Sequence, residues 1–407
     1  MLISIFLISI GAVYAAEGDI LWEKEYDSTK FDYAHGIAVD SKNNVIVTGK
    51  SQAGNSDNYY YYTIKYDPDG GVLWKKWHGD GTINRAFAVA TDGFDNVIVT
   101  GLKKLASTTR YFYTIKYDSN GNVVWTREYD SSSSEDSAYG VAVDSRNNVI
   151  VTGRANNNYY TIKYSQSGDV IWRREYDSGA VDEAYGVTVD SYDNIIVTGR
   201  ANDNYYTIKY DSNGNVIWER DFDGGSLDYG HGVAVDSKNN IIVTGKTDVP
   251  GKGYNYYTIK YDSNGNEIWN ARYKGGSTNK AHGVVVDSYD NVIVTGFSRL
   301  LGIGNIYTIK YDSSGKIIWQ ISKIMNHKFS IDNENEMNGV AVDSLNNILV
   351  TGSIYNGTNW DYYTVKYEGT PPLTKSLPKS LPMHSIIKIL NNNRCKNHTD
   401  LEGCQAG

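Results

Sequence analysis

One phrase recurs seven times along the 407 residues of this chain. Its clearest copy starts with GVAVD at residues 232–236 and continues through an Asn-Asn turn, IIVTG, YYTIKY and a tryptophan. The GVAVD run returns with small changes, starting at Gly36, Ala88, Gly140, Gly186, Gly283 and Gly339. The tryptophans of the phrase follow one another at about 50 residues, and a period of that length indicates a propeller or a solenoid.

Each copy of the phrase predicts four short strands. The GVAVD run is the first, and a turn ending in Asn separates it from VIVTG, because Asn and Asp tolerate the left-handed backbone of tight turns. A loop of variable length leads to YYTIKY. A turn such as DSNGN, in which Gly supplies a positive φ, then leads to the tryptophan strand. Four antiparallel strands per unit predict the blade of an all-β propeller.

The ends of the repeat array are offset. Seven first, second and third strands can be counted, but the last copy ends at Tyr367 without a tryptophan strand. The missing fourth strand stands at the other end, at Ile20–Tyr26. Pairing it with Asp361–Tyr367 would close seven four-stranded blades into a ring and hide the edges that an open array exposes. The sequence therefore predicts a seven-bladed β-propeller over residues 17–368.

The flanking segments differ from the repeats. The first residues, MLISIFLISIGAVYAA, predict a signal peptide over residues 1–16 that is too short to span a membrane. Export would suit a disulfide between Cys395 and Cys404. Residues 369–407 contain most of the prolines and predict a linker and a disordered tail. We expect a secreted or cell-surface, monomeric protein with no membrane span in the mature chain.

Two charged residues recur in every repeat. The Asp that ends each first strand is interpreted as a turn cap rather than a carboxylate ring or metal ligand. The Lys of YTIKY is expected to extend past aromatic neighbours or stack on them. The DSNGN turns resemble the start of a calcium loop but lack its acidic twelfth position. A net charge of −8 without a basic stripe argues against nucleic acid. We expect no metal and no cofactor.

The phrase G-[IV]-A-V-D-S-x-x-N-x-[IV]-V-T-G, followed by Y-x-T-x-K-Y and a tryptophan, resembles the seven-bladed β-propeller repeat (SBBP) family of bacterial and archaeal surface proteins. Its blade pattern also looks like that of the NHL repeats. The resemblance covers about residues 19–368 and implies an exported propeller. It brings no catalytic motif that could be transferred to this chain.

A candidate binding site follows from where the repeats vary. The constant turns fall on one side of the disc and the variable connections on the other, and binding residues concentrate on such loops. One rim position precedes each first-strand glycine or its equivalent, and a second lies three residues earlier. The predicted rim residues are His35, Tyr139, Tyr185, His231 and His282, with Asp32, Asp136, Asp182 and Asp228. Phe87, Asn338, Asn84, Asn279 and Asn335 hold the remaining equivalent positions. The other interpretation is a repeated loop brace.

Three functions compete at this stage. The first is a non-enzymatic binding or scaffolding module for an extracellular protein, peptide or glycan, favoured because no nucleophile motif appears. The second is a propeller lyase or glycosidase with His231 and His282 as an acid/base pair over the channel, which requires a carboxylate close to the imidazoles. The third is a structural component of a surface layer.

Overall fold

The computed structural model describes residues 18–369, except 53, 55–57, 80–82, 105–108, 134, 250–252, 276–277, 301–302 and 329–338. The described residues belong to one compact unit, Gly18–Thr370. They form 28 strands and no helix, so no helix in this part of the chain could cross a membrane. The expected leader, the tail from residue 370 onward and both cysteines lie outside the described residues.

Five sheets contain four antiparallel strands each. Four of them are meanders of consecutive strands. These are β10 (Ser137–Val143), β11 (Val149–Ala155), β12 (Asn158–Tyr164) and β13 (Val170–Tyr176); β14 (Glu183–Val189), β15 (Ile195–Ala201), β16 (Asn204–Tyr210) and β17 (Val216–Phe222); β18 (Asp228–Val235), β19 (Ile241–Val249), β20 (Gly253–Tyr261) and β21 (Glu267–Tyr273); and β22 (Thr278–Val286), β23 (Val292–Leu300), β24 (Ile303–Tyr311) and β25 (Ile317–Lys328).

The sixth sheet has eight strands and consists of two such meanders. They are β2 (Asp32–Val39), β3 (Val45–Gln52), β4 (Tyr59–Tyr66) and β5 (Val72–His78), and β6 (Ile83–Thr91), β7 (Val97–Lys104), β8 (Arg110–Tyr117) and β9 (Val123–Tyr129). A single parallel residue pair, Tyr59 with Ile83, joins the two halves.

The remaining four-stranded sheet combines the two ends of the described chain. Its order is β1 (Ile20–Tyr26), β28 (Trp360–Tyr367), β27 (Ile348–Tyr355) and β26 (Gly339–Val342). β1 runs antiparallel to β28, with Ile20 opposite Tyr367 and Tyr26 opposite Tyr362. The strand that the repeat count placed at the start of the chain therefore pairs with the last third strand, as predicted.

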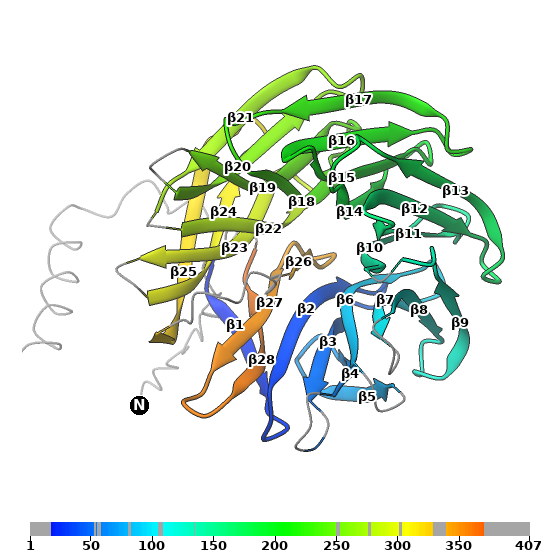
Figure 1. The fold of residues 1–407 in the computed structure, drawn as a ribbon. Helices are drawn as coiled ribbons and strands as arrows, with labels where there is room; N and C mark the ends of the chain where they lie inside the picture. Colours follow the sequence, from blue (N-terminus) through cyan, green and yellow to red (C-terminus); the bar gives the residue numbers. More distant parts are fainter. Residues whose placement is uncertain are drawn as a thin grey trace, which may run out of the picture. The chain divides into compact units, whose positions relative to one another are not determined.

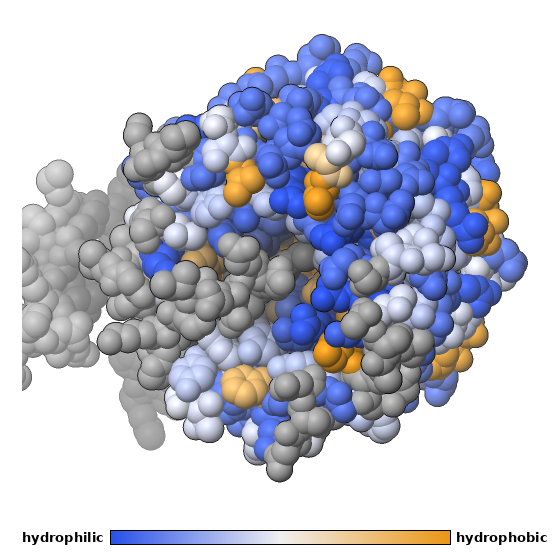
Figure 2. Space-filling view, viewed as in Figure 1, coloured by the Kyte–Doolittle hydropathy of each residue, from blue (hydrophilic) through white to orange (hydrophobic). Residues whose placement is uncertain are grey.

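The first strand of each meander lies innermost, around a common axis (Figure 1). Neighbouring first strands contact one another from β2 through β6, β10, β14, β18 and β22 to β26, and β26 also contacts β2. In the space-filling view the surface is mostly hydrophilic and is hollowed near its middle (Figure 2).

The hydrophobic core lies between neighbouring sheets rather than within one of them. Ile150 and Tyr159 of one sheet, for example, pack with Val197 and Tyr206 of the next. The second strands contribute continuous apolar runs, such as Ile195–Val197, because both of their faces are covered. Each sheet is therefore stabilised mainly by its neighbours.

The repeated tryptophans of the outer strands pack against the adjoining sheet, as the sequence predicted. The ring of Trp172 lies 6.3 Å from that of Tyr210, and its Nε1 donates to the carbonyl of Ser212 at 3.2 Å. Trp22 of β1 does the same to Tyr66 and to the carbonyl of Pro68. The indole thus buries apolar area and satisfies its one donor at the same contact.

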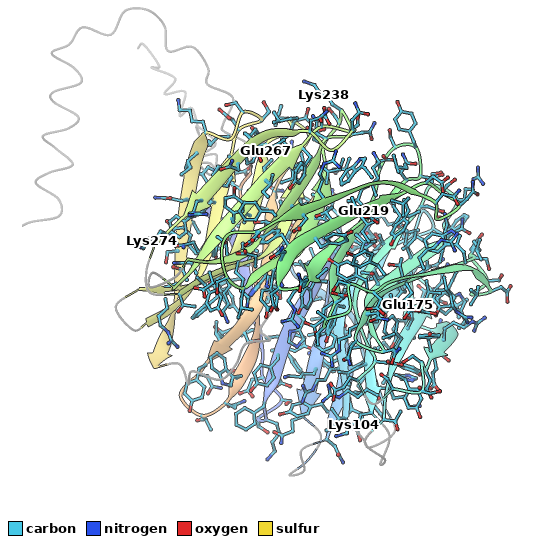
Figure 3. All side chains as sticks on the ribbon, turned by 45° about the horizontal axis from the view of Figure 1, so that its top comes forward. Lys104, Glu175, Glu219, Lys238, Glu267 and Lys274 are labelled. Atoms are coloured by element: carbon cyan, nitrogen blue, oxygen red, sulfur yellow. The ribbon has the colours of Figure 1, made fainter. Side chains whose placement is uncertain are left out.

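The constant turns form a second set of links between sheets, which we call the turn belt. An Asn or Asp with positive φ in each DSxxN turn, such as Asn239 at 61°, matches the predicted left-handed position. The side chain of that residue accepts a hydrogen bond from the backbone N–H of the corresponding turn of the preceding meander. The seven pairs are Ser41–Asp95, Gly93–Asn147, Ser145–Asp193, Ser191–Asn239, Ser237–Asp290, Ser288–Asn346 and Ser344–Asn43, at 2.7–3.0 Å. Lys238, in one of these turns, lies at the opposite edge of the molecule from Lys104, which borders a variable connection (Figure 3).

Candidate axial binding site

In six repeats, a β-bulge in the first strand places one residue outside the regular strand pairing. In β2 the register shifts between Ala34 and Gly36, so His35 has no partner residue on β3. The same shift occurs at the equivalent place in the next five first strands. Bulges often re-aim a side chain beside a functional site. The residues at these shifts are the predicted rim residues.

Six of these residues form a continuous series of ring contacts, which we call the aromatic collar. Its members are His35, Phe87, Tyr139, Tyr185, His231 and His282. Successive ring centroids lie 5.0–5.5 Å apart, within the range of favourable aromatic contacts. The seventh equivalent, Asn338, lies outside the described residues. The structure therefore brings the five predicted His and Tyr residues together.

The glycine after the bulge makes this close approach possible. A Cβ on Gly186 would lie 2.7 Å from the carbonyl oxygen of His231, and one on Gly232 would lie 2.8 Å from that of His282. Real Cβ atoms do not approach backbone oxygen so closely, so neighbouring first strands meet where the side chain is missing. The recurrent glycine of the phrase is thus a packing requirement of the axis.

Two collar imidazoles have unsatisfied polar atoms. His35 is 2% exposed, and neither ring nitrogen of His35 or His231 has a hydrogen-bond partner in the part of the chain that the structure describes. Burial lowers the pKa of both imidazoles well below the ordinary value, and nearby cations lower it further. Burial, with Lys280 and Lys246, lowers the pKa of His282 to about 3. All three rings are neutral at physiological pH. A neutral imidazole offers one donor and one acceptor.

A tier of polar side chains lies next to the collar, toward the variable connections. It is built from the residue two positions before each collar residue and the residue opposite it on the second strand. These cross-strand pairs are Tyr33–Lys50, Arg85–Leu102, Ser137–Arg154, Glu183–Arg200, Tyr229–Lys246 and Lys280–Phe297. We call these residues the polar tier.

On one side of the axis the polar tier is neutralised internally. Arg154 donates to Glu183 at 2.8 Å and to Glu135 at 3.3 Å, and Arg200 lies 3.2 Å from the other oxygen of Glu183. Tyr185 of the collar also donates to Glu183. The two arginines and two glutamates form one network around Tyr139 and Tyr185.

On the other side the polar tier is cationic. The Lys50 ammonium lies 4.1 Å from the ring centroid of Tyr33, and that of Lys246 lies 4.0 Å from the centroid of Tyr229. Arg85 lies over Tyr59 at 5.8 Å and has no ion pair among the described residues. Each of these contacts adds a cation–π attraction between the tier cation and a tyrosine ring.

The predicted aspartates do not belong to the collar. Asp32, Asp136, Asp182 and Asp228 are fully buried and accept hydrogen bonds from the loop before their own strand. Asp182, for example, accepts from both the N–H and the hydroxyl of Ser178 at 2.7 Å. These bonds are those of a loop brace, the alternative that the sequence left open. A role for these aspartates in ligand binding stays a prediction.

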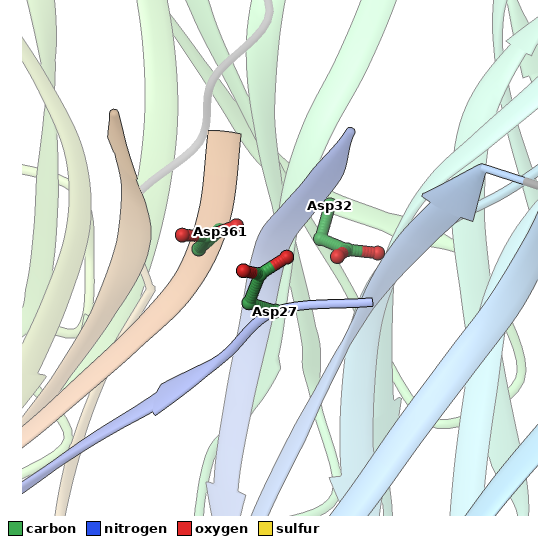
Figure 4. Close-up of side chains that lie close together, drawn as sticks. All are labelled: Asp27, Asp32 and Asp361. Carbon is green, nitrogen blue, oxygen red and sulfur yellow. The ribbon is translucent and has the colours of Figure 1, made fainter. Parts of the chain in front are cut away.

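One group of carboxylates was not expected from the sequence. One oxygen from each of Asp27, Asp32 and Asp361 lies within 4.8 Å of the others (Figure 4). Burial and the neighbouring Asp27 raise the pKa of Asp361 to about 7. Asn359 donates to Asp27 at 3.0 Å and to Asp361 at 2.9 Å. Oxygen ligands of this kind suit Ca²⁺, but the amide donors already bond to two of the carboxylates, and we assign no ion here.

A second arrangement that sequence reasoning missed is a buried ion pair in every repeat. The Lys of YTIKY reaches the Asp that ends the first strand, and the N–O distances are 2.7–3.1 Å. In the third repeat the pair is Lys163–Asp144, in which both side chains are at most 4% exposed. The expectation that this Lys extends past or stacks on aromatic neighbours was wrong. The signal was present, because both residues recur seven times.

The same aspartates cap their turns, which confirms that interpretation. Asp144 accepts from the backbone N–H of Arg146 and of Asn148 and from the Asn148 amide. Burial raises the pKa of Asp144, but the hydrogen bonds from Lys163 and Asn148 outweigh it and hold the pKa below the ordinary value. The carboxylate is ionised and fully satisfied, so these seven positions are scaffold.

Among the described residues, the charges beside the collar imidazoles are not those that an acid/base pair would need. The charged groups that act on the three imidazoles are cations: Lys50 and Arg85 for His35, and Lys246 and Lys280 for His231 and His282. An acid/base pair needs a partner that tunes its pKa toward the working pH, whereas here it is moved far below. The arrangement can therefore form hydrogen bonds but is poorly suited to proton transfer.

Comparison with known proteins identifies the class. Residues 223–252 match a family model described as a beta-propeller repeat. An uncharacterized WD repeat-containing protein of Acanthamoeba polyphaga mimivirus is 28% identical over 104 residues, which make up 22% of this chain and 8% of that protein. The chain is a β-propeller protein.

The matching model is that of the SBBP repeat, so the resemblance seen in the sequence is confirmed at residues 223–252. One solved structure agrees on the fold, and on the fold alone. Sqt1 from Chaetomium thermophilum has a TM-score of 0.52 at 10% identity and covers 88% of this chain and 100% of its own. A protein of unknown function from Bacteroides caccae has a TM-score of 0.45 at 12% identity, covering 68% and 94%. A gluconolactonase from Xanthomonas campestris has a TM-score of 0.41 at 12% identity, covering 87% and 91%.

Proposed function

We propose that the chain is an exported, non-enzymatic binding module of the cell surface, built as a closed seven-bladed propeller. The ligand binds over the axis, on the face of the variable connections. The observation that carries this proposal is the pair of imidazoles, His35 and His231, whose four ring nitrogens lack partners among the described residues of a bulge-built collar. Buried polar groups are normally hydrogen-bonded, so an unsatisfied set at the axis indicates a missing partner.

Three observations together support seven blades and a closed ring. The sheet of β2–β9 consists of two meanders joined at one residue pair, and each counts as one blade. The turn belt has seven equivalent links, the last of which joins Ser344 to Asn43. The core cluster around Val45 and Tyr62 includes Leu349 and Tyr362 of the last repeat. An open array would leave the first and last of these surfaces without a partner.

The test is a ligand screen with a matched pair of variants. The full chain is applied to arrays of glycans and peptides, and hits are compared with the double variant His231→Ala, His282→Ala. We expect at least a tenfold loss of affinity in the double variant, because two collar side chains leave the site. The control, Tyr192→Ala with Tyr289→Ala, removes two exposed rings from constant turns and should bind as the parent does. Equal binding by both double variants would place the ligand elsewhere on the surface.

A further inference from the structure

β1 differs from the other outer strands in how the chain holds it. β13, for example, is connected to β12 by the turn of residues 165–169 and to β14 by residues 177–182. Within the described residues, β1 is connected to the propeller only by residues 27–31, which lead into β2. At its other end, two backbone hydrogen bonds of 2.7 and 2.8 Å join residues 18 and 19 to Glu368. A change in one connection is therefore enough to release β1 from its sheet.

The contacts of β1 are made with residues on the far side of that connection. Its strand partner is β28, and the ring of Trp22 lies 6.2 Å from that of Tyr66. Tyr26 stacks on Tyr62, with ring centroids 4.5 Å apart. The same strand from a second copy of the chain can make all of these contacts. When two copies exchange an identical element, only the connecting segment changes, so residues 27–31, which we call the closure hinge, decide between monomer and dimer.

The closure hinge holds a β-branched residue in the left-handed region of the backbone. Thr29 is exposed and has a φ of 69°. The equivalent residues of the other connections are Gly81, Ser132, Gly179, Gly225 and Gly276. The three of these that the structure describes also have positive φ, from 69° to 104°. Glycine adopts this conformation freely, whereas a β-branched residue is strained in it. Thr29 is thus strained where most of the other connections carry glycine.

The hydrogen bond that braces the closure hinge is not special to it. The backbone N–H of Ser28 donates to Asp32 at 2.8 Å, and Ser178 donates to Asp182 in the same way at 2.7 Å. This bond stabilises the connections alike, so it does not offset the strain of Thr29. Extension of the hinge lets Thr29 return to the β region, and short hinges under strain favour exchange of the element that they hold.

We propose that two copies of this chain exchange β1 at high protein concentration. In the exchanged dimer, β1 of each copy pairs with β28 of the other, so both rings remain closed. The partner is a second copy because the place beside β28 is already filled by the Trp22 and Tyr26 of this sequence. Because the hinge is one of the variable connections, the two copies are joined at that face. This inference does not depend on any ligand at the axis.

Disulfide trapping shows which copy supplies β1. Lys24 lies opposite Thr364, so the variant Lys24→Cys with Thr364→Cys can link β1 to β28. Cys395→Ser and Cys404→Ser remove the other thiols. The protein is concentrated, diluted, oxidised at once and separated by denaturing electrophoresis without reductant. We expect a covalent dimer whose fraction grows with the concentration before dilution. Lys24→Cys in the same background, without Thr364→Cys, measures random cross-linking. A dimer fraction no greater than in this control would overturn the exchange, since copies that associate by another surface form the bond within one chain.

Two variants of the otherwise unchanged chain test the hinge by sedimentation. Thr29→Asn replaces the β-branched residue with one that tolerates the left-handed region, so the dimer should dissociate about tenfold more readily or more, because each dimer contains two hinges. Thr29→Val keeps the β-branch and should dimerise at least as strongly as the parent. Equal dimerisation of the Asn and Val variants would overturn the role of the hinge. Axial ligand binding by either variant is expected to match the parent, so failure of this proposal leaves the proposed function to its own test.

Discussion

The two ends of the first strands differ in whether their buried polar groups have hydrogen-bond partners. At the constant-turn end, every carboxylate such as Asp144 receives a lysine and turn N–H groups, and the turn belt links all seven repeats. At the collar end, the ring nitrogens of His35 and His231 are buried with no partner among the described residues. The residues at the first end are almost identical between repeats, whereas those of the collar change between His, Phe and Tyr.

The difference separates scaffold from site on physical grounds. A group that is repeated and fully hydrogen-bonded needs nothing from outside the protein, and it stabilises the fold. A group that varies and remains unsatisfied destabilises the free protein until a partner arrives. Binding sites commonly retain such locally unfavourable groups. The comparison therefore predicts opposite responses of the two ends to the removal of a polar side chain.

The largest effect is expected at the scaffold end. Lys163→Met removes the cation and leaves the Asp144 carboxylate buried without its charge partner. Breaking one side of a buried pair typically lowers the free energy of unfolding by about 3–5 kcal/mol. Denaturant unfolding, followed by tryptophan fluorescence, measures the loss. Lys238→Met, which removes an exposed lysine, is the control and should change stability by less than about 0.5 kcal/mol. A loss below about 1 kcal/mol in Lys163→Met would show that these pairs do not hold the repeats together.

Asp361 sharpens the comparison, because it is a buried carboxylate without a lysine. No cation pairs with it among the described residues, and its pKa is raised to about 7 by burial and by Asp27. The folded state then holds a proton that the unfolded state releases near pH 4, so the contribution of Asp361 to stability falls as pH rises from about 4 to 7. Four other repeats carry Asn at this position: Asn158, Asn204, Asn255 and Asn305.

We therefore expect the stability of Asp361→Asn, relative to that of the parent chain, to increase with pH. The difference in the free energy of unfolding should be about 1–2 kcal/mol larger at pH 8 than at pH 5. Unfolding curves at both pH values measure it. Asp118→Asn, at an exposed turn, is the control: hydrogen bonds from Asn122 lower the pKa of Asp118, so its carboxylate is ionised in the folded and the unfolded state at both pH values, and its difference from the parent should not change with pH. A difference that does not change with pH would mean that Asp361 ionises normally.

Much of this architecture could be predicted from the sequence, since it depends on local patterns that recur. The turn residues, the strand order, the tryptophan contacts and the pairing of Ile20–Tyr26 with the last third strand all follow from period, turn chemistry and counting. The rim position was also visible, because the residue before the glycine varies while its neighbours do not. What the sequence did not indicate is that this residue sits in a bulge. A bulge depends on cross-strand register, which no single strand encodes.

Interactions between distant residues were missed for the same reason. Lys163 and Asp144 lie on different strands and come together only when the sheet forms. Their spacing in the sequence did not indicate which of several Asp residues the Lys would contact. Asp27 and Asp361 are separated by almost the whole propeller and become neighbours only when β1 pairs with β28. Conversely, Asp32 and Asp182 looked like rim residues because they precede the collar by three positions, but their hydrogen bonds brace the loops.

The smallest effect, and the one that tests the comparison most directly, is expected in the collar. His35→Phe replaces an unsatisfied ring with an apolar ring that the neighbouring repeat already carries as Phe87. Removing a buried group that has no partner is nearly neutral or stabilising, so at pH 8 the change in the free energy of unfolding should lie between about 0 and +1 kcal/mol.

Burial holds the pKa of His35 well below its ordinary value, so below pH 6.5 the unfolded state of the parent binds a proton that the folded state does not. The parent therefore loses stability as the pH falls through that range and the variant does not, so the advantage of His35→Phe should grow from pH 8 to pH 5. A destabilised variant, or an advantage that shrinks at pH 5, would show that His35 is satisfied within the fold and belongs to the scaffold.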